Sequence, residues 1–153
     1  MTKWTRTTIV ACGITFASAV IAAASFALTG PGTIRVTDEL VKHIYVDSGS
    51  PGRGAGDIDF YRGQLFNKGI TPTSIGHSDI TCTNTGTGSM NCTGTYFLPK
   101  GKIMVGGVIG SRLFYVLSVI GGTGLYDNVR GTLTATYLGG SPSKEFLLFR
   151  LVV

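Results

Sequence analysis

Eight short strand-like segments, separated by turn residues, constrain the fold of this chain more than any other feature. They are residues 34–46, 57–66, 74–83, 90–98, 103–109, 113–120, 132–138 and 145–152. Gly, Pro, Ser and Asp gather between them, as in residues 47–56 and 139–142, and such clusters mark turns. The first segment has an irregular period, and Asp38–Lys42 within it could form one helical turn. The pattern as a whole predicts an all-β domain, either a sandwich or a small closed barrel.

Residues 1–27 differ from the rest of the chain and are expected to be a signal peptide. Lys3 and Arg6 provide a positively charged start, and no further charged residue occurs until Arg35. The segment between them is apolar, with small residues suited to cleavage ending at Ala27. We therefore expect a secreted or otherwise extracytoplasmic protein whose single domain is residues 28–153. An uncleaved segment would instead anchor the chain, since about 20 apolar residues can span a bilayer.

The remaining charges do not favour a nucleic-acid partner. The full chain has 13 Lys and Arg against 8 Asp and Glu, a formal net charge of +5. Removal of the predicted signal peptide takes away two positive charges, and the basic residues that remain are scattered along the chain. A nucleic-acid site requires a basic patch or stripe, so we expect no nucleic-acid partner.

Cys82 and Cys92 are predicted to form a disulfide. The residues between them are rich in Gly, Ser and Thr and suit the tip of a hairpin. If Thr87 is the centre of that tip, the two cysteines face each other across antiparallel strands, within reach of a disulfide. Export favours oxidation, and two buried thiols are the alternative. The histidines add no recognisable metal-binding spacing, so no metal site is predicted.

A glycine-rich stretch lies between the sixth and seventh strand segments. Its characteristic residues are Gly121, Gly122, Thr123, Gly124, Tyr126 and Gly131. Glycines at this density permit positive φ angles and close backbone approach. The stretch lacks the Lys-Ser/Thr ending of a P-loop and the spacing of a dinucleotide-binding loop. We therefore expect a tight crossover between two strands rather than a phosphate site.

The same stretch resembles the Gly-Gly-Thr/Ser-Gly-x-Phe/Tyr-x-x-Ala/Val-x-Gly segment of the allene oxide cyclase and dirigent superfamily of β-barrels. Residues 94–103 resemble the hairpin before that family's fifth strand, and Gly56-Asp57 with Leu65-Phe66 resembles the second strand of the cyclases. The resemblance covers residues 44–153. It implies a single eight-stranded antiparallel β-barrel with an apolar cavity for a small apolar ligand, acting without a cofactor. It also allows a homo-oligomer.

The resemblance implies Asp47, Asp59 and Tyr61 as candidate catalytic residues. Plant cyclases use a Glu near the end of the first strand, but here residues 42–47 contain no Glu and Asp47 is the nearest acid. Asp59 and Tyr61 share one face of the second segment, and the likeness to the cyclases turns that face inward. Burial would raise the pKa of Asp59, which suits general acid or base catalysis. The alternative is that Asp59 is solvated, or paired with Arg53 or Arg62.

Three functions are compatible with these observations. The first is a cofactor-free cyclase or isomerase that holds a flexible apolar substrate in a reactive conformation. The second is a non-catalytic protein of dirigent type, which binds or guides a reaction without performing it. The third is a packed barrel that acts through its surface.

Overall fold

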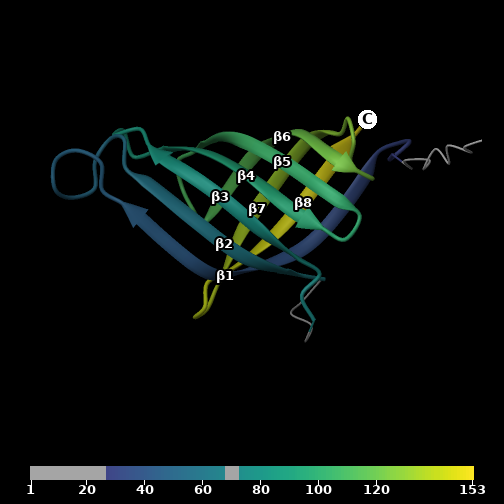
Figure 1. Cartoon of the computed structure of the whole chain (residues 1–153), viewed down its shortest axis with the longest axis horizontal. Helices are drawn as coiled ribbons and strands as arrows, with labels where there is room; N and C mark the ends of the chain where they lie inside the picture. The colour runs from purple at the N-terminus through teal and green to yellow at the C-terminus, as the bar shows by residue number, and fades with distance from the viewer. Residues whose placement is uncertain (1–26, 68–72) are drawn as a thin grey trace, which may run out of the picture.

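The computed structural model describes residues 27–67 and 73–153. Its strands are β1 (Gly32–Val46), β2 (Ile58–Phe66), β3 (Gly76–Asn84), β4 (Met90–Leu98), β5 (Gly101–Ile109), β6 (Phe114–Gly124), β7 (Arg130–Gly139) and β8 (Lys144–Val152). They form a closed antiparallel barrel in which β8 pairs with β1 (Figure 1). The predicted all-β, eight-stranded fold is confirmed. Apart from Ala27, the predicted signal peptide lies outside the described residues.

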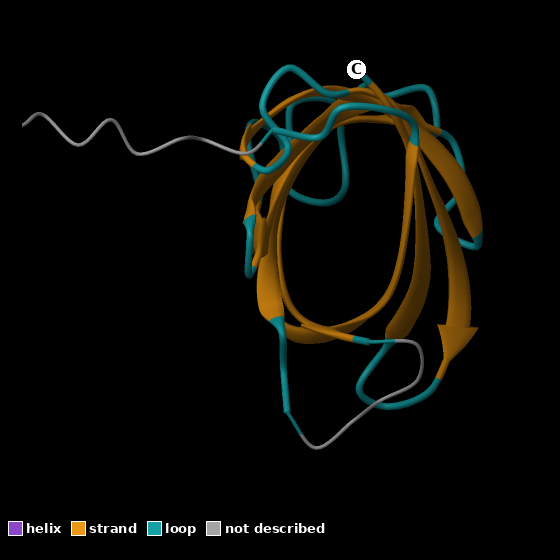
Figure 2. Ribbon diagram, turned by 90° about the vertical axis from the view of Figure 1, so that its right-hand side faces the viewer, coloured by secondary structure: helices purple, strands orange, loops and turns teal. Residues whose placement is uncertain are grey.

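Sequential hairpins alternate between the two ends of the barrel. The loops after β1, β3, β5 and β7 (residues 47–57, 85–89, 110–113 and 140–143) lie at one end, which we call the mouth. The turns after β4 and β6 (residues 99–100 and 125–129) lie at the other end, which we call the base. Figure 2 shows the strands as a closed ring around the interior. In the part of the chain that the structure describes, no helix is long and apolar enough to cross a membrane.

The half of the barrel near the base is filled by side chains. Leu65, Ile103, Val105, Leu133 and Phe149 are fully buried there. Each such side chain stabilises the fold by about 1.5–3 kcal/mol through its burial. At the base itself the Leu28 backbone N–H donates to the Leu125 carbonyl over 2.8 Å, and the Leu28 side chain packs on this core.

A β-bulge explains the irregular period of the first strand. The pairing of β1 with β2 shifts between Leu40 and Lys42, which leaves Val41 as an extra residue that is 58% exposed. Before the bulge, Asp38 and Leu40 line the interior. After the bulge, the alternation of inward and outward residues along β1 is reversed. His43 pairs with Tyr61, which lies on the inward face of β2. The helical turn considered for Asp38–Lys42 is therefore wrong, because this segment is a bulged strand.

The glycine-rich stretch is also different from the prediction. Gly121–Gly124 continue β6 and pair with β5, and the turn into β7 follows at residues 125–129. The stretch is therefore part of an ordinary hairpin, not a crossover. Glycine is required because a Cβ on Gly122 would lie only 2.7 Å from the Lys102 carbonyl oxygen. Gly124 has a φ of 65°, a left-handed conformation that glycine adopts readily.

Candidate functional site

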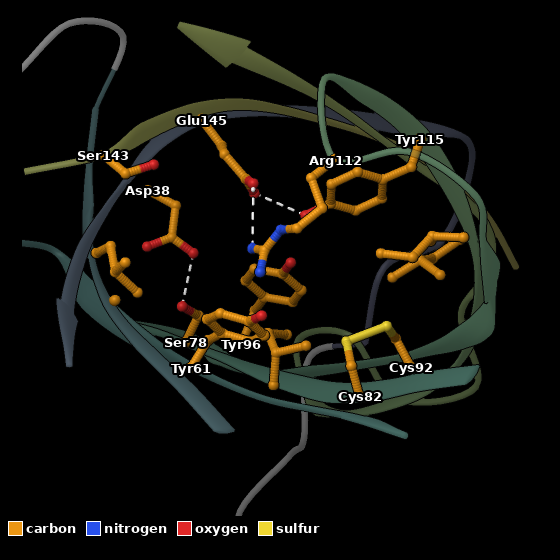
Figure 3. Close-up of a pocket in the computed structure, with 15 residues that line it drawn as sticks. Asp38, Tyr61, Ser78, Cys82, Cys92, Tyr96, Arg112, Tyr115, Ser143 and Glu145 are labelled. Atoms are coloured by element: carbon orange, nitrogen blue, oxygen red, sulfur yellow. Dashed lines mark hydrogen bonds and ion pairs between the residues drawn. A yellow bond between two sulfur atoms is a disulfide. The ribbon is translucent and has the colours of Figure 1, made fainter. Parts of the chain in front are cut away.

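An inner cavity lies in the mouth half of the barrel (Figure 3). Its walls carry the polar residues Asp38, Tyr61, Ser78, Tyr96, Arg112, Tyr115, Ser143 and Glu145, together with aliphatic side chains and both cysteines. The cavity is thus more polar than the family resemblance implied. Its volume is about 40 Å³, which is room for a few water molecules, since each needs roughly 10–15 Å³.

A wider outer pocket adjoins the inner cavity at the mouth. Both are lined by Leu40, Tyr61, Arg112, Ser143 and Glu145, and the outer pocket adds His43, Leu113 and Tyr137. Its volume is about 340 Å³, within the range of about 300–1,000 Å³ that is typical of small-molecule sites. Because Arg112 belongs to both linings, its side chain lies at the boundary between the cavity and the outer pocket.

Asp38 is the partly buried acid of the inner cavity. Its Oδ2 accepts a 2.6 Å hydrogen bond from the Ser78 hydroxyl, whereas its Oδ1 is buried without a hydrogen-bond partner among the described residues. Gly63 makes room for this carboxyl group, since a Cβ at that position would overlap Oδ1. Burial raises the pKa of Asp38 to about 7, against the lowering effect of Ser78 and with a smaller raising effect of Glu145. Asp38 therefore exchanges its proton near neutral pH.

Arg112 reaches over the mouth from the loop between β5 and β6. Its Cζ lies 3.9 Å from the centroid of the Tyr61 ring, and its Nη2 lies 3.6 Å from Glu145 Oε1. The other oxygen of Glu145 accepts a 2.6 Å hydrogen bond from the Tyr115 hydroxyl. Burial, together with Glu145, raises the pKa of Tyr115, so this phenol remains a neutral donor. The Tyr61 ring also stacks on His43, with centroids 4.6 Å apart.

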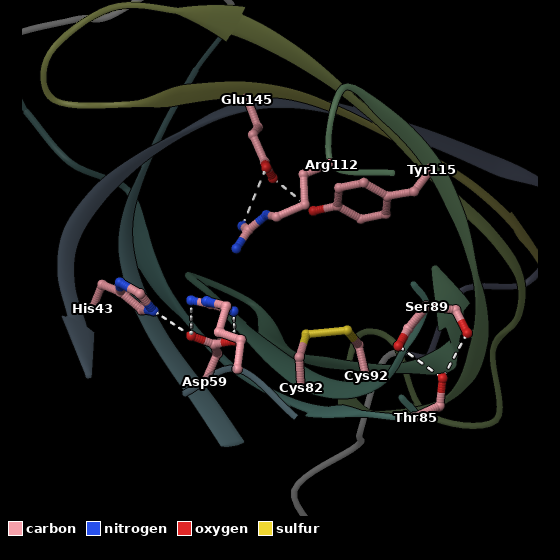
Figure 4. The surroundings of a disulfide bond; sticks show 10 residues. His43, Asp59, Cys82, Thr85, Ser89, Cys92, Arg112, Tyr115 and Glu145 are labelled. Atoms are coloured by element: carbon pink, nitrogen blue, oxygen red, sulfur yellow. Dashed lines mark hydrogen bonds and ion pairs between the residues drawn. A yellow bond between two sulfur atoms is a disulfide. The ribbon is translucent and has the colours of Figure 1, made fainter. Parts of the chain in front are cut away.

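Asp59 is inward and fully buried, but it is paired (Figure 4). Its Oδ1 accepts from His43 Nε2 over 2.6 Å, and its two oxygens accept from the Arg53 guanidinium over 3.1 and 3.2 Å. Burial acts to raise the pKa of Asp59, but the hydrogen bonds and charges of His43 and Arg53 outweigh it and lower that pKa. The expected rise in the pKa of Asp59 is therefore wrong. Asp59 is buried, but it is also paired with Arg53, which was the alternative.

The other acids of this region hold the loop of residues 47–57. Asp57 accepts hydrogen bonds from the Ser48 and Gly54 backbone and from the Tyr45 hydroxyl, at 2.9, 2.6 and 2.7 Å. Asp47 is exposed and accepts from the Gly52 backbone over 3.0 Å. Of the three candidates Asp47, Asp59 and Tyr61, only Tyr61 lines the inner cavity.

The predicted disulfide is present in the cavity wall. Cys82 and Cys92 are directly opposite in the register of β3 and β4 and are joined by a disulfide (Figure 4). This confirms the bond and excludes the two-thiol alternative.

None of the glycine-stretch residues lines the inner cavity or the outer pocket. That motif therefore shapes the hairpin and not the site. The described residues contain no group of three His, Cys, Asp or Glu side chains that could hold a metal ion.

Sequence reasoning missed Asp38, Ser78, Arg112 and Glu145. Asp38 did carry a signal, because it is a charged residue at the same parity as Val36 and Leu40, two apolar residues on either side. Arg112 carried no such signal, because it lies in a short loop, where side chains follow no regular alternation. Glu145 was placed correctly at the start of the last strand but was not connected to a site.

No family model and no curated protein matches this chain by sequence. Solved structures do match it. A pyocyanin demethylase superposes with a TM-score of 0.68 and 23% identity over 79% of this chain and 100% of its own. The Diels Alderase AbmU from Streptomyces koyangensis gives a TM-score of 0.64 and 17% identity, over 79% of this chain and 63% of its own.

A pterocarpan synthase dirigent protein superposes with a TM-score of 0.61 and 12% identity, over 79% of this chain and 82% of its own. Identities at this level concern the fold and not the chemistry. The closed eight-stranded topology agrees with these likenesses. The chain therefore has the closed eight-stranded barrel fold of these structures, as its resemblance to the allene oxide cyclase and dirigent superfamily implied.

Proposed function

We propose that this barrel binds a small, largely apolar organic molecule at its mouth and exchanges a proton with it through Asp38, as a cofactor-independent isomerase or cyclase. The observation that carries the proposal is the free Oδ1 of Asp38, which is buried at the cavity without a partner among the described residues. A buried polar atom without a partner destabilises the fold, and such groups recur where chemistry requires them.

The protonation equilibrium of Asp38 supports this role. A general acid or base is most effective when its pKa lies near the working pH, and the pKa of Asp38 is about 7. In the ionised state Oδ1 would take a proton from an acidic C–H of the ligand, while Ser78 continues to donate to Oδ2. Return of that proton to another atom of the ligand gives an isomer, so the cycle needs no oxidant or reductant.

The structural neighbours support a small organic ligand. By their names, one acts on pyocyanin and another performs a Diels–Alder reaction. The apolar residues of the outer pocket, Leu40 and Leu113 among them, suit an organic ring system that is also largely apolar.

We also propose that the protein is secreted. The disulfide supports it, because such bonds persist in oxidising compartments, and it agrees with the signal peptide predicted for residues 1–27.

Proton exchange can be tested without knowledge of the natural substrate. 2-Tetralone is an apolar two-ring ketone whose C–H groups beside the carbonyl exchange with D₂O, and proton NMR follows the exchange. We expect the wild-type protein to accelerate exchange and Asp38→Asn to lose that acceleration. Asp47→Asn is the matched control, because Asp47 is an exposed loop residue outside the cavity. Equal exchange by the wild type and Asp38→Asn would refute the catalytic role.

A second function, non-catalytic binding of dirigent type, is favoured by one observation. The inner cavity is only about 40 Å³, so a ring-sized ligand in the outer pocket would reach Asp38 only if the boundary side chains moved. If they do not move, the barrel binds its ligand without proton exchange. The same NMR samples distinguish the two functions, since the ligand lines would then broaden with protein while the exchange rate stays at its background value.

A further inference from the structure

The outer pocket combines a cation with flat and apolar side chains. His43, Tyr61 and Tyr137 contribute rings, and Leu40 and Leu113 contribute aliphatic groups. Leu113 is 69% exposed and Tyr137 is 40% exposed. Exposed apolar side chains that gather around a hollow commonly mark a binding site. The guanidinium of Arg112 lies where this pocket meets the inner cavity.

Arg112 is less tightly paired than the other arginines that meet carboxylates in the described residues. Arg62 binds Asp79 with two hydrogen bonds of 2.7 and 2.8 Å, and Arg53 binds Asp59 with two of 3.1 and 3.2 Å. The Arg112–Glu145 separation is 3.6 Å, beyond the roughly 2.7–2.9 Å of a charge-assisted hydrogen bond. Glu145 instead makes its short bond to Tyr115.

The Arg112 side chain is also accessible, at 41% exposure. A guanidinium presents five N–H donors in a planar fork, and the Tyr61 ring covers part of it. Because Arg112 lines the outer pocket, the exposed part of its side chain can meet a ligand there. A planar carboxylate matches that fork with two parallel hydrogen bonds. A phosphate group would more commonly meet several cations or a helix N-terminus, and among the described residues Arg112 is the one Lys or Arg in either lining.

We propose that Arg112 is the specificity-determining residue of the mouth, and that the ligand is a flat ring compound bearing a single carboxylate. The carboxylate pairs with the Arg112 guanidinium, and the ring lies in the outer pocket among Leu40, His43 and Tyr137. Pairing with the ligand draws the guanidinium away from Glu145, which keeps its bond to Tyr115. Movement of Arg112 also widens the passage to the inner cavity and to Asp38. The inference rests on the proposed ligand site and adds the chemical class that this site takes.

A matched pair of ligands tests the inference. 2-Naphthoate and 2-naphthamide share one ring system and differ in charge, and titration calorimetry at pH 7.5 and low salt measures both affinities. We expect the wild type to bind the carboxylate about tenfold more tightly than the amide, the lower end for hydrogen bonds between charged groups because Arg112 is partly exposed. In Arg112→Gln the preference should disappear while the affinity for the amide is unchanged.

Two further variants keep the test decisive. Arg62→Gln removes an arginine from the outer face of the barrel, where it pairs with Asp79, and should leave the preference intact. Arg112→Lys keeps the charge but loses the planar fork, so it should retain only part of the preference, and it replaces Arg112→Gln if that variant does not fold.

Equal binding of both ligands to the wild type would overturn the inference, as would an unchanged preference in Arg112→Gln. Failure of the wild type to bind either naphthalene would also overturn it. The proposed function would then still be judged by the exchange of 2-tetralone, which carries no carboxylate to pair with Arg112.

Discussion

Replacement of Asp38 by Asn should change how the stability of the barrel depends on pH. In the folded protein, burial raises the pKa of this carboxyl group from its ordinary 3.8 to about 7. The folded state therefore binds the proton more tightly than the unfolded state does. Between these two pKa values the folded state holds more protons, so its stability falls as the pH rises. The asparagine side chain does not titrate and lacks this dependence.

The size of the effect follows from the same two pKa values. One pKa unit corresponds to about 1.4 kcal/mol, so the wild type should lose roughly 4 kcal/mol relative to Asp38→Asn between pH 4 and pH 8. Urea unfolding of both proteins at several pH values measures this difference. Carbon-13 NMR of the Asp38 carboxyl group should show a midpoint near pH 7.

Asp79→Asn is the matched control for this experiment. The hydrogen bonds from Arg62 lower the pKa of Asp79, so its contribution to stability is present above its ordinary pKa of 3.8 and is lost only as the pH falls further. The Asp79→Asn curve should therefore run parallel to that of the wild type from pH 4 to pH 8. If the Asp38→Asn curve also runs parallel to that of the wild type, within about 1 kcal/mol, then burial does not raise the pKa of Asp38 as argued.

Three other perturbations have defined outcomes. Asp59→Asn should lower the free energy of unfolding by about 2 kcal/mol in urea, because His43 and Arg53 lose a charged acceptor; a loss no larger than that of the exposed Asp79→Asn would contradict the pairing. The double substitution of Cys82 and Cys92 by Ser should cost about 3 kcal/mol in the same assay while the barrel still folds, and an unfolded chain would show that the disulfide is essential. The intact mass of the secreted protein should correspond to a chain that begins at Leu28, and a mass that includes residues 1–27 would indicate an uncleaved anchor.

The strands of this barrel were predictable because turn residues separate them and most of them show alternation or compact apolar runs. Met90–Leu98 was predicted with its observed bounds, and the Cys82–Cys92 pairing followed from hairpin symmetry. The first strand was harder to place, because the extra residue Val41 reverses its parity. A periodic pattern cannot show which strand partner accommodates an insertion, since this depends on contacts distant in sequence.

The candidate site was only partly predictable. The inward face of β2 was implied by a family likeness, and Tyr61 does line the cavity. The role expected of Asp59 changed because Arg53 reaches it from a loop, and no period predicts where a loop side chain points. Arg112 was missed for the same reason. Asp38 was overlooked because its partner Ser78 lies 40 residues away in the sequence.

The alternation of hairpins between the mouth and the base also affects how such a protein can diversify. The loops that border the ligand pocket are separated in the sequence by pairs of strands, and none of them contributes to the packed base. Each can therefore change in length or composition without disturbing the packed core. Descendants of one ancestral barrel can in this way acquire new ligands by successive replacement of mouth loops. Such a history would leave the scaffold recognisable in space long after sequence identity had fallen below the level at which ancestry is readily detected.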